Sequence, residues 1–135
     1  MLTDDEGSVL PMVVGYALLA AALLFVCVCA TDLYIAQKRL DSLADAAALA
    51  ASDGFILRSE GADVRAELTD DDVRDQAEAL VDAVDSEATL VSAGTPDGVT
   101  ARVTVAADWH PPLFSAFVPD GVPLEATATS RTALR

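Results

Sequence analysis

Few residues in this chain can do acid–base, nucleophilic or metal chemistry, and they do not cluster. The single histidine, His110, lies between a tryptophan and a proline, and the two cysteines are Cys27 and Cys29. Residues two apart point about 200° apart around a helix, so these thiols cannot bridge each other there. One distant histidine does not complete a metal-ligand set with them, and no nucleophile elbow, zinc-helix motif or phosphate loop occurs. We therefore predict a protein that is not an enzyme and has no cofactor.

Three adjacent acids offer one further candidate for a metal site. Asp70, Asp71 and Asp72 follow one another directly. Adjacent residues in the first turn of a helix point to different sides, and the spacing of an EF-hand loop with its central glycine is missing. We interpret these acids as residues that favour the positive end of a helix dipole, so no metal ion is expected.

The charge of the chain excludes one class of partner. The net charge is −14, and residues 54–98 contribute −9 of it. Nucleic-acid binding requires clustered Lys and Arg, so we expect no nucleic-acid partner, and the acids keep an exposed surface soluble. Large apolar side chains are few outside one segment, which leaves room for one modest core and little volume for a small-molecule substrate.

The apolar segment near the N-terminus is the first of the predicted elements along the chain. After an acidic leader at 1–8, residues 9–30 contain 20 apolar side chains out of 22 and no charge. At about 1.5 Å per residue the run spans roughly 33 Å, which predicts a single-pass transmembrane helix bound to membrane lipid, with Pro11 in its first turn. The alternative is an export signal cut before Thr31, leaving a secreted or tethered small ligand-binding domain. The length of the run and the acidic leader favour the anchor.

Helix-forming residues continue beyond the apolar run as far as Gly54. The segment 31–53 is predicted to be an amphipathic helical extension, because apolar residues recur at spacings of three and four. This helix-packing seam suits another helix or the face of a small sheet, and it consists of Leu33, Ala36, Leu40, Leu43, Ala47 and Ala50.

The same segment carries a motif. Asp32 follows the apolar run, the basic pair Lys38 and Arg39 precedes Leu40, and an Ala-Asp-Ala-Ala-Ala-Leu-Ala-Ala block surrounds Asp45. Residues 7–53 resemble the N-terminal signature of the TadE/TadG-like proteins of tight-adherence (Flp) pilus systems, and the Gly-Ser-Val-Leu-Pro stretch at 7–11 resembles versions from high-GC Gram-positive bacteria.

The resemblance implies a membrane-anchored accessory or minor pilin-like component that contacts pilus-assembly machinery or other pilin-like subunits through its N-terminal helix. Pilin-like members are cut after a glycine and carry Glu at the fifth residue beyond the cut. The candidate processing point here is Gly7–Ser8, and the fifth residue is Met12. The chain is therefore closer to the unprocessed TadG-like members.

The resemblance also implies that the protein lies in the cytoplasmic membrane with its C-terminal domain outside the cytoplasm, on the cell surface or in the pilus. The flanking charges favour the opposite orientation, because Lys38 and Arg39 follow the apolar run and no basic residue precedes it. Two charges this far from the apolar edge carry little weight, so we follow the resemblance.

Residues 54–135 are predicted to form a small α+β domain with one helix and a roughly three-stranded antiparallel sheet. Phe55–Leu57 is read as a short apolar turn or strand before a loop containing Gly61. Thr69 is a good N-cap for a helix over 70–87, whose apolar face consists of Val73, Ala77, Leu80, Val81 and Val84. Alternating patterns predict strands at 89–93, 99–107 and 122–132, with a tight turn at 94–98.

An aromatic-rich loop separates the last two of these strands. Residues 109–118 hold the only tryptophan and two of the four phenylalanines. Two interpretations remain open: the loop folds over an open sheet edge and completes the core, or it is a hydrophobic contact for a pilus partner or the membrane surface.

Overall fold

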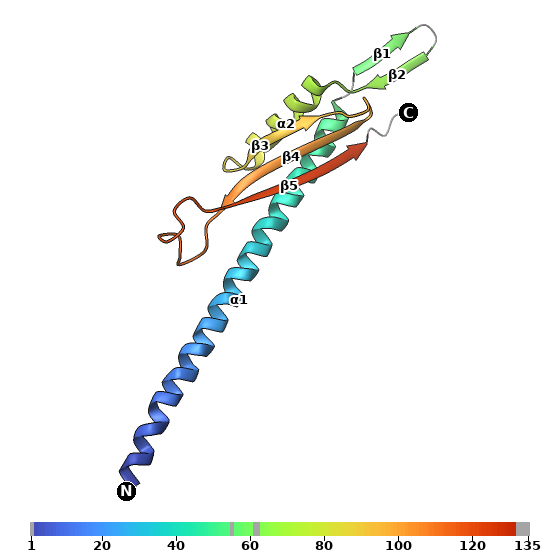
Figure 1. Ribbon diagram of the computed structural model, residues 1–135. Helices are drawn as coiled ribbons and strands as arrows, with labels where there is room; N and C mark the ends of the chain where they lie inside the picture. The colour runs from blue at the N-terminus through green and yellow to red at the C-terminus, as the bar shows by residue number, and fades with distance from the viewer. Residues whose placement is uncertain (1, 55, 61–62, 132–135) are drawn as a thin grey trace. The chain divides into compact units, whose positions relative to one another are not determined.

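The computed structural model describes residues 2–54, 56–60 and 63–131, and within these it contains two helices and five strands (Figure 1). A long apolar N-terminal helix, a second helix and a three-stranded antiparallel sheet confirm the predicted α+β class. The elements in chain order are α1 (Leu2–Asp53), β1 (Ile56–Glu60), β2 (Asp63–Glu67), α2 (Asp70–Val84), β3 (Thr89–Gly94), β4 (Thr100–Trp109) and β5 (Val122–Arg131).

The chain divides into two compact units, one ending at Tyr34 and one beginning at Ile35. The first unit is the N-terminal part of α1. This helix begins at Leu2, so Pro11 lies inside the helix and not in its first turn as the sequence predicted. Proline lacks the N–H that would bond to the carbonyl four residues earlier, so the helix continues through one missing hydrogen bond.

The second unit is built on the sheet, whose strand order is β3-β4-β5. In the antiparallel register Leu90 lies opposite Val105, and Val103 lies opposite Ala128. Alternation along β4 sends Val103 and Val105 into the core, where neither has any exposed surface. The predicted strands are present, and their bounds shift by one or two residues; residue 132 lies outside the described part of the chain.

The turn between β3 and β4 is held by a carboxylate and a glycine. Asp97 Oδ1 accepts hydrogen bonds from the N–H groups of Val99 (3.0 Å) and Thr100 (2.6 Å), and Oδ2 accepts one from the Thr100 hydroxyl (2.9 Å). These donors hold the pKa of Asp97 below its ordinary value, the Val99 N–H being the strongest cause. Gly98 has φ +73°, a left-handed conformation that glycine adopts without steric cost.

Helix α2 begins as predicted, with the Thr69 side chain accepting a hydrogen bond from the Asp72 N–H at 3.3 Å. It ends at Val84, three residues earlier than predicted, because Asp85 adopts an extended conformation and its carboxylate accepts the Glu87 N–H at 2.9 Å. Val84, the last residue of α2, is 65% exposed, so it is not buried with the rest of the predicted apolar face. The buried face consists of Val73, Ala77 and Val81.

A two-stranded hairpin, β1–β2, forms a separate antiparallel sheet that the sequence analysis did not predict as such. The prediction of a short apolar turn or strand identified part of β1 and missed β2. Four of the five residues of Asp63–Glu67 are charged or alanine, so this strand has almost no hydrophobic signal. Phe55 and Gly61 lie outside the described residues.

The core of the second unit is made of small side chains. Of the sixteen buried apolar residues in its cluster, nine are alanine, and they come from α1, α2, the segment before β3, and strands β4 and β5. Because an alanine side chain is a single methyl group, helix and sheet backbones can approach closely. The larger buried side chains are Leu40, Leu43, Leu68, Val73, Val81, Val103 and Val105.

Candidate functional site

The C-terminal part of α1, from Ile35 to Asp53, joins the core and holds most of the residues singled out from the sequence. Of the predicted helix-packing seam, Leu40, Leu43 and Ala47 are buried, and Leu33, Ala36 and Ala50 are half-buried. The buried face of the helix also includes Ala44, Ala48 and Ala51, which have no exposed surface and were not part of the predicted seam. The buried stripe repeats at i, i+3, i+4, i+7 and i+8, which is the wide face of a helix packed on a sheet. The only sign of Ala44, Ala48 and Ala51 in the sequence was the high alanine content of this segment.

The residues of the family-like motif separate into one core residue and several surface residues. Leu40 is 4% exposed and packs in the core. Asp32, Lys38, Arg39 and Asp45 are all exposed, so the structure does not bring the motif together as a single cluster. The leucine therefore serves the fold, whereas the charged positions face outward.

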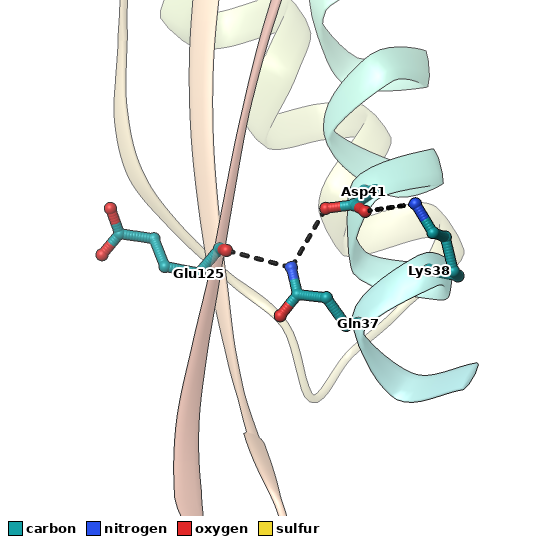
Figure 2. Close-up of polar contacts among 4 residues, drawn as sticks. All are labelled: Gln37, Lys38, Asp41 and Glu125. Carbon is teal, nitrogen blue, oxygen red and sulfur yellow. Dashed lines mark hydrogen bonds and ion pairs between the residues drawn. The ribbon is translucent and has the colours of Figure 1, made fainter. Parts of the chain in front are cut away.

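A polar contact fixes the beginning of this helical segment to the sheet (Figure 2). Gln37 Nε2 donates to the backbone carbonyl of Glu125 in β5 at 3.2 Å and to Asp41 Oδ1 at 3.0 Å. Lys38 Nζ lies 3.4 Å from Asp41 Oδ2, an ion pair between exposed side chains on successive turns. Such a pair contributes about 0.3–0.5 kcal/mol, so it adds little to the stability of the domain.

A second polar contact fixes the other end of the segment. The Ser52 hydroxyl lies 3.1 Å from the Ser130 hydroxyl in β5 and donates to the carbonyl of Leu49 at 2.8 Å. Since Gln37 meets Glu125 and Ser52 meets Ser130, α1 and β5 run in the same direction along each other. These two contacts hold α1 at both ends of β5. Between them lies the alanine face of α1, which consists of Ala44, Ala47, Ala48 and Ala51.

The side of this helical segment away from the buried stripe is exposed. Ile35 and Leu49 are 42% and 59% exposed. A shallow depression between α1 and the end of α2 is lined by Arg39, Ser42, Leu43, Ala46, Val84 and Asp85.

The candidate chemical residues do not form a reactive site. Cys27 is exposed and Cys29 half-exposed, and both are free thiols. His110 is exposed. Across residues 2–54, 56–60 and 63–131, no group of three His, Cys, Asp or Glu side chains is placed to hold a metal ion. Of the three adjacent acids, Asp70 accepts the Thr95 N–H at 2.7 Å.

The loop between β4 and β5 exposes its large side chains. Leu113 is 85% exposed and Phe117 is 78% exposed, while Phe114 is 42% exposed with its ring centroid 5.5 Å from that of Phe117. The interpretation that these side chains complete the core is wrong, because none of them belongs to the buried cluster.

The N-terminal part of α1 exposes a continuous apolar surface. Between Val9 and Val28, the exposed fractions of the large apolar side chains on this surface range from 48% to 69%. In the described part of the chain, one helix is long and apolar enough to cross a membrane. Gly7 and Ser8 lie within the helical backbone of α1.

No protein-family model, characterised protein or solved structure matches the chain.

Proposed function

We propose that this protein is a non-enzymatic, single-pass membrane protein anchored by residues 9–30. The exposed apolar surface of the first part of α1 carries the proposal. Soluble monomers rarely expose contiguous apolar patches of more than a few hundred Å², and a helix of this length and composition matches the thickness of a bilayer. The free-energy cost of exposing such an apolar surface is lower in lipid than in water.

We further propose that the anchored protein is an accessory or minor pilin-like component of a Flp-type pilus assembly or secretion system. The proposal rests on the resemblance of residues 7–53 to the TadE/TadG-like signature. The exposed positions of Lys38, Arg39 and Asp45 support a contact with other subunits, because surface charges can select a partner without disturbing the core. The domain lies outside the cytoplasm in this proposal.

In this mechanism the lipid-embedded part of α1 retains the protein, and the exposed apolar residues Ile35 and Leu49 offer a surface to a neighbouring helix. The alanine face is already covered by the protein's own sheet. A partner would therefore dock on a rigid helix whose position is fixed by its own domain, and no part of the core would have to open.

The membrane anchor is tested by alkaline carbonate extraction of the full-length protein. We expect the wild type to stay with the membrane and the variant Leu19→Arg/Leu23→Arg to be extracted, since each arginine at the centre of a span costs about 2.5–3.5 kcal/mol. Leu49→Arg is the matched control: Leu49 is 59% exposed on the same helix, as Leu23 is, but lies beyond the apolar run. Extraction of the wild type would refute the anchor.

The pilus assignment is tested separately by deletion and complementation. Loss of the gene should abolish or reduce piliation, and Lys38→Glu/Arg39→Glu should fail to restore it while the purified variant unfolds within a few degrees of the wild-type temperature. Normal piliation in the deletion strain would refute the assignment. N-terminal sequencing separates the remaining alternatives: a start at Thr31 indicates a secreted domain, a start at Ser8 indicates pilin-like processing, and an intact leader indicates an unprocessed anchor.

A further inference from the structure

The loop between β4 and β5 is an apolar projection in a strongly acidic protein. Residues 110–119 contain no Asp, Glu, Lys or Arg, although the whole chain carries a net charge of −14. Leu113 and Phe117 are among the most exposed large apolar residues of the described chain, at 85% and 78%, and the Phe114 ring contacts that of Phe117 at a tilt of 54°. An uncharged surface of this kind is suited to an apolar neighbour.

The loop is held by its own backbone. The N–H groups of Phe117 and Val118 both donate to the carbonyl of Phe114, at 2.9 and 3.1 Å, and the Gly121 N–H donates to the carbonyl of Val118 at 3.1 Å. Leu113 has φ +68°, a left-handed conformation that is strained for a leucine. The loop thus maintains a strained backbone that displays a leucine to the outside, a kind of strain that is found at functional sites.

The loop lies at the end of the domain where the chain enters it. Glu125 is beside Gln37 and Ser130 is beside Ser52, so β5 begins near the start of the α1 segment that packs on it. Val122, and the loop that precedes it, therefore lie at the Ile35 end of the domain. Leu49, by contrast, is fourteen residues further along α1, about 21 Å away at the rise of a helix.

The entry end of the domain is tethered close to the end of the apolar run. Ile35 is the fifth residue after Ala30, and even a fully extended chain of this length spans at most about 18 Å. If residues 9–30 cross the bilayer, Ile35 stays within this distance of its surface for any orientation of the helix. The loop is then one of the parts of the domain that are able to reach the lipid.

We propose that Leu113, Phe114 and Phe117 insert into the interfacial layer of the bilayer and form a second contact with the membrane beside the anchor. This inference rests on the proposed anchoring and is independent of the pilus assignment and of which side of the membrane the domain occupies. Leucine and phenylalanine are residues that bury well at the boundary between headgroups and acyl chains. Two points of attachment would fix the tilt of the domain over the membrane.

The test uses tryptophan fluorescence of the full-length protein in phosphatidylcholine vesicles that contain lipid brominated in the upper part of its acyl chains. The probe variant is Trp109→Phe/Phe117→Trp, which moves the only tryptophan to the tip of the loop. The matched control is Trp109→Phe/Leu49→Trp, which places it on an exposed position at the far end of the domain. Circular dichroism and carbonate resistance of both variants establish that they are folded and anchored.

The expected result is loss of most of the fluorescence of the Phe117→Trp probe in brominated vesicles, with none lost by the Leu49→Trp control. Absence of quenching at position 117 in a carbonate-resistant protein would overturn the loop contact and leave the anchor intact. Equal quenching at both positions would also overturn it, because the domain would then lie on the membrane without a specific contact. A blue shift of the Phe117→Trp emission without quenching, if it depends on the amount of protein per vesicle, would also overturn the lipid contact. The loop would then contact a second copy of this chain. Extraction of the wild type by carbonate would instead refute the proposed membrane anchor.

Discussion

The substitution Leu40→Ala tests whether the motif leucine belongs to the core of the domain. Leu40 is 4% exposed and belongs to a cluster in which nine of sixteen side chains are alanine. Truncating a buried leucine costs about 2–5 kcal/mol, because transfer free energy is lost and a cavity remains. The unit from Ile35 onward has about one hundred residues, so its whole stability is about 5–15 kcal/mol. A loss of about 3 kcal/mol would lower the Tm by roughly 12–24 °C.

The assay is thermal unfolding of the full-length protein in detergent micelles, followed by the fluorescence of Trp109. This single tryptophan ends β4, so it reports on the domain and not on the apolar part of α1. Leu49→Ala is the matched control: it makes the same change in the same helix at a position 59% exposed, and should shift stability by no more than about 0.5 kcal/mol. A wild-type Tm for Leu40→Ala, or an equal loss in both variants, would refute the packing of α1 against the sheet.

Three further predictions concern polar contacts. Thr69→Ala should destabilise the domain by about 1 kcal/mol in urea unfolding, because the N-cap of α2 is lost. Gln37→Ala should cost no more than about 1 kcal/mol, since water can replace the side chain at the exposed Glu125 carbonyl. Asp97→Asn should lower the Tm at neutral pH. Because the pKa of Asp97 is lowered by the N–H groups of Val99 and Thr100, its contribution is present above the ordinary value of 3.8 and disappears as the pH falls through the lowered value.

Each of these has its own control. Thr69→Ser should retain most of the stability, since the hydroxyl that caps the helix remains. A loss of several kcal/mol from Gln37→Ala would mean that the contact with β5 carries more of the packing than its exposure indicates. The Tm difference between Asp97→Asn and the wild type should narrow in strong acid, and a difference that widens as the pH falls would contradict the role of the carboxylate.

Much of the fold could be predicted because its patterns are periodic. The alternation of Ala101, Val103 and Val105 fixed the buried face of β4, and Thr69 marked the start of α2. The end of α2 was missed because Asp85 stops the helix through its own side chain, a local bond that competes with a favourable helical pattern. The hairpin β1–β2 was missed because its second strand carries few apolar residues.

The candidate site was predictable only in part. The spacing of the seam found Leu40, Leu43 and Ala47, but alanine scores weakly in any hydrophobic pattern, so the buried Ala44, Ala48 and Ala51 were not distinguished from their exposed neighbours. The direction of the loop side chains was not encoded in their composition either. Leu113 and Phe117 are as apolar as core residues, and only the backbone turns at Pro111 to Gly121 decide that they face outward.

The contact between α1 and β5 joins the beginning of the domain to its end. The hydrogen bonds of Gln37 and Ser52 reach partners 88 and 78 residues further along the chain. During synthesis the C-terminal part of α1 emerges first, and its contacts with β5 cannot form until this last strand is made. Contacts of such high sequence separation close slowly, because loop entropy must be overcome before they form. Completion of the domain therefore waits for the C-terminal strand, and a chain that stops before β5 would leave uncovered the part of α1 that packs on this strand.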